Sequence, residues 1–129
     1  MICIVDDYSA ICKGVAMLLR ANGHECECFL DPCAALAFMK RQKPSLLLLD
    51  LMMPAMHGVE VLRQIRTDPT LSDLPVILMS AAADELHIAE AQLLGVKAVL
   101  SKTELMWDDL PRMVTALVGI ARPVVGGAR

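Results

Sequence analysis

The chain has 129 residues and a formal net charge of −3, and 56% of its residues are hydrophobic. This length fits one domain that buries an ordinary core, and no apolar run approaches the roughly 20 residues of a membrane span. The apolar start lacks the basic flank of a signal peptide, and the lysines and arginines are scattered. We therefore expect a soluble, cytoplasmic protein that binds neither membranes nor, directly, nucleic acid.

The N-terminal part of the chain predicts two strands and two helices. The continuous apolar run 2–5 is typical of a strand that is covered on both faces of a parallel sheet. A helical apolar pattern follows, and Asn22-Gly23 is expected to end it. Residues 25–29 alternate polar and apolar side chains, which favours a strand at the sheet edge. Asp31-Pro32 then predicts the N-cap and first residue of a helix that ends near Gln42.

The C-terminal part continues the alternation of strands and helices. Apolar runs predict strands at 46–49, 76–79 and 98–100, and helical patterns follow Gly58, Asp84 and the last strand. Because proline is tolerated only in the first turn of a helix, Pro111 predicts that the last helix starts near Asp108 or Asp109. Residues 122–129 are expected to be a flexible tail or the start of a linker. Five strands alternating with five helices predict an α/β fold, a single doubly wound domain.

Five cysteines, an odd number, argue against a disulfide framework. Cys26 and Cys28 are predicted to face opposite sides of their strand, an arrangement that suits neither a metal nor a bridge. A zinc site that adds His24 is the less favoured alternative. We expect buried, reduced thiols instead.

The predicted strands place polar side chains at their C-terminal ends, where ligands bind in doubly wound sheets. These side chains are Asp6, Asp7, Asp50, Ser80 and Lys102. Three carboxylates held close together cannot all ionise cheaply unless a cation neutralises them, and a ligand set without His or Cys selects Mg²⁺. A carboxylate nucleophile, a divalent metal, an ammonium group and a hydroxyl group together predict a phosphoryl-transfer site that forms an acyl phosphate.

Several of these residues also have an ordinary structural interpretation. Taken alone, Asp7 fits a helix cap, Ser80 a turn residue and Lys102 a solvated charge. His57 is expected to face solvent at a helix start rather than to bind a metal. Trp107, the only tryptophan, is expected in the core or, alternatively, on a partner surface.

Four segments together match the pattern of one known family: Val5-Asp6-Asp7, Leu49–Pro54 with Gly58, Met79-Ser80-Ala81 and Ser101-Lys102. They resemble the CheY-like receiver domain of two-component response regulators, over about residues 1–121. The resemblance implies a flavodoxin-like fold, with a five-stranded parallel sheet in the order 2-1-3-4-5 and five helices. It implies a phosphoprotein of phosphorelay signal transduction rather than an enzyme, with at most weak self-phosphorylation and autodephosphorylation.

The resemblance also implies a role for each site residue. Asp50 would accept a phosphoryl group from a histidine kinase or a histidine phosphotransfer protein, and Ser80 and Lys102 would sense it. Mg²⁺ would be held by Asp6, Asp7, Asp50 and the backbone carbonyl of Met52. A downstream protein effector is the expected output partner, and a phosphorylation-dependent dimer stays an option.

The chain departs from the family pattern at Val99 and Thr103. Val99 stands where receivers usually have Tyr or Phe, so the usual aromatic reporter is missing, and Thr103 replaces the proline after Lys102. Because a cis bond without proline costs about 2.5–4 kcal/mol, we expect a trans bond there. Met52 and Ala82 cannot orient an attacking water, which predicts slow autodephosphorylation. The alternative suggested by Val99 and Thr103 is a degenerate receiver that acts as a phosphorylation-independent interaction module.

Overall fold

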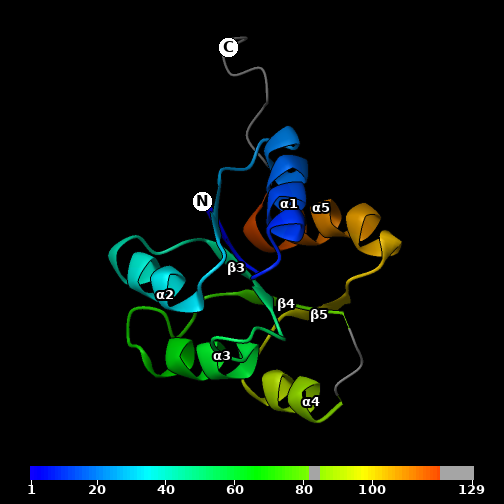
Figure 1. The fold of residues 1–129 in the computed structure, drawn as a ribbon. Coiled ribbons are helices and arrows are strands. Elements are labelled where there is room, and N and C mark those ends of the chain that lie inside the picture. The colour runs from blue at the N-terminus through cyan, green and yellow to red at the C-terminus, as the bar shows by residue number, and fades with distance from the viewer. Residues whose placement is uncertain (82–84, 120–129) are drawn as a thin grey trace.

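The computed structural model describes residues 1–81 and 85–119, with only the backbone at 104–106. Strands and helices alternate along the chain (Figure 1). The strands are β1 (Ile2–Val5), β2 (Cys26–Phe29), β3 (Leu46–Asp50), β4 (Val76–Ser80) and β5 (Ala98–Ser101). The helices are α1 (Ser9–Ala21), α2 (Pro32–Arg41), α3 (Gly58–Thr67), α4 (Glu85–Leu93) and α5 (Glu104–Val118).

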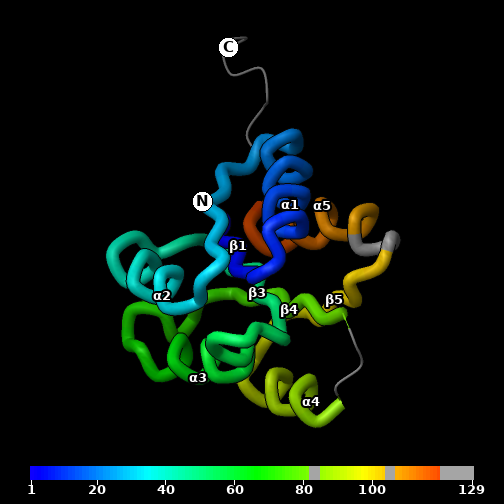
Figure 2. The backbone as a smooth tube through the Cα atoms, in the orientation of Figure 1, coloured from blue at the N-terminus to red at the C-terminus, as the bar shows by residue number. Residues whose placement is uncertain are grey.

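All five strands form one parallel sheet in the order β2-β1-β3-β4-β5, which confirms the predicted doubly wound fold. Figure 2 shows α1 and α5 together on one side of the sheet, and α2, α3 and α4 on the other. Each side has its own apolar core. The three central strands are fully buried because helices cover both of their faces, whereas the edge strands β2 and β5 are only partly buried.

The predicted helix boundaries are largely confirmed by their capping groups. The Asp31 carboxylate accepts hydrogen bonds from the backbone N–H groups of Cys33 and Ala34, and it thereby caps α2. Beyond α1 and α4 the chain turns at Gly23 (φ 88°) and Gly95 (φ 79°), a conformation that glycine adopts without steric penalty. The predicted cap Asp84 and the tail 122–129 lie outside the described residues.

The predicted start of the last helix was wrong. Helix α5 begins at Glu104, four residues before the earlier of the two predicted starts, and Pro111 lies inside it. The aromatic ring of Trp107 explains this extra turn. A Cβ atom placed on Gly14 of α1 would lie only 3.0 Å from Cη2 of Trp107, so the ring lies directly against the glycine. Packing of Trp107 on α1 and the adjoining core stabilises the turn before Pro111, which confirms its predicted place in the core.

The prediction for Cys26 and Cys28 was also wrong. Side chains alternate along a strand, so residues two positions apart face the same side. Both thiols belong to the core between the sheet and α1.

The Lys102–Thr103 peptide bond is trans, as expected, because the described residues contain no cis peptide. None of the helices in the described ranges is long and apolar enough to cross a membrane.

Candidate functional site

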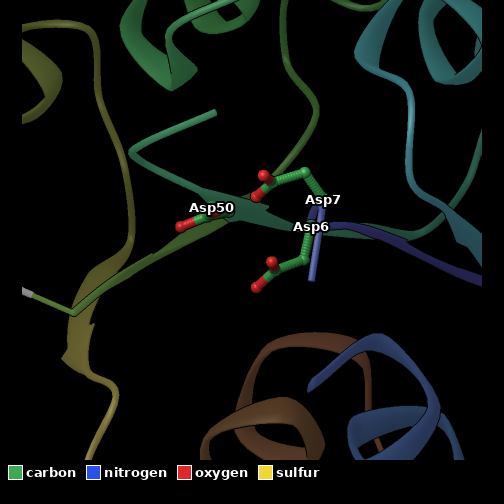
Figure 3. A group of neighbouring side chains, drawn as sticks. All are labelled: Asp6, Asp7 and Asp50. Carbon is green, nitrogen blue, oxygen red and sulfur yellow. The ribbon is translucent and has the colours of Figure 1, made fainter. Parts of the chain in front are cut away.

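Three carboxylates meet at the C-terminal edge of the sheet. Asp6 and Asp7 directly follow β1, and Asp50 is the last residue of β3. Strands β1 and β3 are neighbours, with Val5 opposite Leu49, so their ends deliver these side chains to one place. Each of the three carboxylates has an oxygen within 4.8 Å of an oxygen of the other two. Figure 3 shows the three side chains converging there from two strand ends.

Lys102 lies between two of these carboxylates. Its Nζ atom is 2.6 Å from Oδ2 of Asp6 and 3.0 Å from Oδ1 of Asp50. The lysine is positioned by its backbone, whose N–H donates to the carbonyl of Ser80 at 2.7 Å, so the ends of β4 and β5 stay together. Only 11% of the lysine side chain is exposed, compared with none of Asp6 and 4% of Asp50. This ion-pair network is therefore largely shielded from water.

Burial dominates the electrostatics of Asp50. The pKa of Asp50 is raised to about 6, mainly by loss of hydration and also by the nearby Asp6, although the Lys102 ammonium and the Met52 N–H lower it in part. For Lys102, burial lowers the pKa, but hydrogen bonds and charge attraction to Asp6 and Asp50 outweigh it, so the net pKa is raised. Lys102 is thus protonated at neutral pH, whereas ionisation of Asp50 costs free energy because its carboxylate is buried.

The carboxylate cluster fits a hard divalent cation. The fully buried Oδ2 atom of Asp6 lies 2.6 Å from the Lys102 ammonium and has no other partner among the described residues. Its other oxygen accepts the backbone N–H of Tyr8 at 2.9 Å, which fixes the orientation of the carboxylate. An all-oxygen donor set of this kind suits Mg²⁺ or Mn²⁺ better than zinc or copper. Asp6, Asp7 and Asp50 would hold such an ion.

The loop after Asp50 is tightly packed against the backbone of β3. A Cβ atom on Gly58 would lie 2.4 Å from the carbonyl oxygen of Asp50 and 2.9 Å from Cα of Leu51, so only glycine fits. The Gly58 N–H donates to the Leu51 carbonyl at 2.8 Å. Met52 lies at the rim, 51% exposed, and its N–H is 3.4 Å from Oδ1 of Asp50. These contacts thus fix the start of α3 against the backbone of Asp50, the candidate nucleophile.

Other predicted site residues have more limited structural support. Ser80 lies buried at the end of β4, beside the end of β3 that carries Asp50. Its role as a sensor stays a prediction, as does a metal contact by the Met52 carbonyl. Ala82 lies outside the described residues.

His57 does not face solvent, so that expectation was wrong. Its Nδ1 accepts the N–H of Val59 at 3.2 Å and caps α3, while its half-buried ring lies against that of His87, with centroids 4.1 Å apart. A histidine just before a helix is compatible with this capping role, but no sequence signal pairs it with a residue of α4. The bond from Tyr8 to Asp6 was likewise missed, because a backbone donor leaves no residue-type signal.

Comparisons with known proteins agree with the fold. The family model of the response regulator receiver domain matches residues 2–115. The DNA-binding response regulator MtrA of Mycolicibacterium paratuberculosis is 32% identical over 87 residues, which cover 67% of this chain and 37% of MtrA. The match therefore spans little more than a third of that relative.

Two solved structures extend the similarity to three dimensions. The chemotaxis protein CheY4 of Vibrio cholerae superposes with a TM-score of 0.82 at 22% identity, over 90% of this chain and 96% of that one, and shows the shared fold. The Mn²⁺-bound form of response regulator Rcp1 has a TM-score of 0.78 at 27% identity, over 95% of this chain and 97% of that one.

Proposed function

Because the chain belongs to the response regulator receiver domain family, we propose that it accepts a phosphoryl group on Asp50 in a Mg²⁺-dependent reaction. The observation that carries this proposal is the contact of Lys102 with both Asp6 and Asp50 beside a third carboxylate, Asp7. A purely structural ion pair needs one acid and one base. Three acids around one ammonium leave negative charge that a divalent cation and a phosphoryl group would balance.

Each residue would have a separate task in this reaction. The Asp50 carboxylate attacks the phosphorus atom, and the donor leaves with the electron pair of the broken bond. Lys102 would offer its ammonium to a phosphoryl oxygen, and Ser80, buried at the end of β4, would offer its hydroxyl group to a second one. Mg²⁺ held by Asp6, Asp7 and Asp50 would neutralise charge on the phosphoryl oxygens. Rcp1, to which this chain is similar, was solved in a Mn²⁺-bound form, and this supports binding of a divalent ion.

We propose that the donor is a phosphohistidine on a sensor histidine kinase or a phosphotransfer protein, and that the phosphorylated domain switches its contact with a protein effector. The domain acts on itself, with at most weak autophosphorylation and autodephosphorylation, and has no separate substrate. Its lysines and arginines are scattered, so we propose protein rather than nucleic acid as its direct partner.

Intact-mass measurement after incubation with acetyl phosphate and Mg²⁺ tests this function. We expect a gain of about 80 Da, the mass of one phosphoryl group, that requires the metal. Asp50→Asn should abolish the gain, while Asp73→Asn, a change at an exposed acid paired with Lys43, should not. If wild type gains no mass, or if Asp50→Asn gains as much, Asp50 is not the acceptor, and a degenerate interaction module becomes the better description.

A further inference from the structure

An open groove lies between α1 and the edge strand β2, and none of the three clustered carboxylates lines it. It encloses about 500 Å³ and is lined by Lys13, Ala16, Met17, Arg20 and Cys28. Two of these five side chains are cationic and none is acidic. Arg20 is fixed in place because its guanidinium donates to the backbone carbonyl of Cys26 at 3.0 Å. The groove therefore brings a half-buried thiol and two positive charges together at one accessible place.

Cys28, which lines this groove, contacts a second cysteine, Cys12 of α1. Its Sγ atom is 3.3 Å from the backbone carbonyl oxygen of Cys12 on α1, and the two thiols are also within hydrogen-bonding reach of each other. Cys12 is only 1% exposed, and its Sγ contacts the carbonyl oxygens of Ile4 and Phe29 at 3.6 and 3.8 Å. The accessible thiol of Cys28 thus contacts the buried Cys12. In such a pair, a mixed disulfide formed on the accessible cysteine can be displaced by the second, resolving cysteine.

The remaining cysteines lack this combination. Cys3 belongs to the core on the opposite side of the sheet, and burial raises its pKa to about 12. Cys26 is 5% exposed, and burial raises its pKa to about 11. Cys33 is exposed on α2 and is not part of the groove. Because the thiolate is the reactive form, Cys3 and Cys26, like Cys12, should be slow to make the first attack. Cys33 does not line the groove and, among the described residues, has no cysteine contact that could resolve a mixed disulfide.

We propose that Cys28 is a site of thiol–disulfide exchange with an anionic disulfide of the glutathione type, and that Cys12 resolves the product into a Cys12–Cys28 bond. In the first step the Cys28 thiolate attacks one sulfur of glutathione disulfide and releases one glutathione thiolate. In the second, slower step, Cys12 loses its proton and its sulfur attacks Cys28 Sγ, which releases the second glutathione thiolate. Burial raises the pKa of the Cys12 thiol to about 12, so this step should limit the rate of cross-linking. Two thiol protons leave the protein, and one disulfide is reduced to two thiols, so atoms and electrons balance.

Charge and geometry select this class of reagent. The carboxylates of glutathione can pair with Lys13 and Arg20 while its sulfur reaches Cys28, whereas a cationic disulfide such as cystamine would be repelled. The resulting bond would join the first part of α1 to the edge strand of the sheet. It would also remove the Cys12 S–H contacts with the strand ends beside Asp6. The proposal is independent of the phosphoryl chemistry of Asp50.

The test exposes the full reduced chain to glutathione disulfide, with acid quenching, intact mass and peptide mapping. Wild type should lose about 2 Da as a Cys12–Cys28 cross-link forms, and Cys12→Ser should stop at a mixed disulfide on Cys28, about 305 Da heavier. Cys33→Ser is the matched control and should form the cross-link unchanged. Early quenching of wild type should trap the same mixed disulfide on Cys28, a result that requires no substitution in the core.

The charge requirement is tested separately with Lys13→Gln. This variant should react several-fold more slowly at Cys28 with glutathione disulfide but at the wild-type rate with uncharged 2-hydroxyethyl disulfide. The proposal is overturned if glutathione disulfide modifies Cys33 while Cys28 stays free, if the cross-link joins other cysteines, or if cystamine reacts at Cys28 as fast as glutathione disulfide.

Discussion

Replacing Asp50 by asparagine should stabilise the fold at neutral pH. Burial raises the pKa of Asp50 to about 6 from an ordinary value of 3.8, so the folded protein keeps this proton at a pH where the unfolded chain has lost it. The Asp50 contribution to the free energy of unfolding is therefore greatest below pH 3.8 and falls as the pH rises to about 6. A difference of about 2 pKa units corresponds to about 3 kcal/mol.

The neutral amide of Asp50→Asn is nearly the same size and does not ionise, so the variant lacks this penalty. The difference in unfolding free energy, variant minus wild type, should increase by up to about 3 kcal/mol between pH 4 and pH 7 and stay constant above it. Urea denaturation at several pH values without metal measures it. Exposed Asp73 provides a control of opposite sign, because its hydrogen bond with Lys43 lowers its pKa. Asp73→Asn should lose stability relative to wild type as the pH rises.

Magnesium should reverse this advantage. A cation that binds only the folded state stabilises it more when it binds more tightly, and Asp50 is one of its three expected carboxylate ligands. Mg²⁺ at pH 7 should therefore raise the unfolding midpoint of wild type more than that of Asp50→Asn. The reasoning is refuted if the stability difference between the two proteins does not change with pH, or if Mg²⁺ stabilises both equally.

Three further predictions follow from the same contacts. Lys102→Met removes the ammonium that opposes the rise in the Asp50 pKa. The Asp50 carboxyl should therefore titrate about 1–3 pH units higher in a carbon-detected NMR titration. Lys97→Met, a change at an exposed lysine, should leave the Asp50 titration unchanged. Gly58→Ala places a methyl group 2.4 Å from the Asp50 carbonyl and should destabilise the fold by about 1–3 kcal/mol in urea, and an unchanged midpoint would contradict it. Met52→Asn puts an amide that can orient water at the exposed rim of the candidate site. The acyl phosphate should then decay several-fold faster, as measured by intact mass after removal of the donor. Equal decay would argue against a role for this position.

The fold was predictable because its signals are local. Apolar runs of three or four residues marked four of the strands, and polar–apolar alternation marked the fifth. Asp31-Pro32 and Asn22-Gly23 marked helix ends by the same groups that the structure uses. Helix α5 was not predictable in this way. Pro111 is a strong local signal against the preceding turn, and it is overridden by contact of Trp107 with Gly14, a residue 93 positions earlier in the chain. Tertiary packing of this kind leaves no periodic trace in the sequence.

The sequence predicted which residues form the candidate site, but not how strongly their charges interact. Strand ends that carry Asp6, Asp50 and Lys102 must meet in a parallel sheet, so their proximity follows from the order of the strands. Sequence alone treated Lys102 as a partner for an incoming phosphoryl group. The structure shows that it already binds both acids at 2.6 and 3.0 Å, so a phosphoryl group would have to compete for it.

The same leucines that make Asp50 easy to find make it difficult to ionise. Leu46 to Leu49 are fully buried, and the same strand, β3, ends at Asp50, a residue that is only 3% exposed as a whole. Burial at this position opposes the charged form that a nucleophile requires, and Lys102 only partly offsets it. A bound cation would stabilise that form further. The site therefore couples metal binding to the reactivity of Asp50 through one quantity, the free energy of its ionised form, which titration with and without Mg²⁺ measures directly.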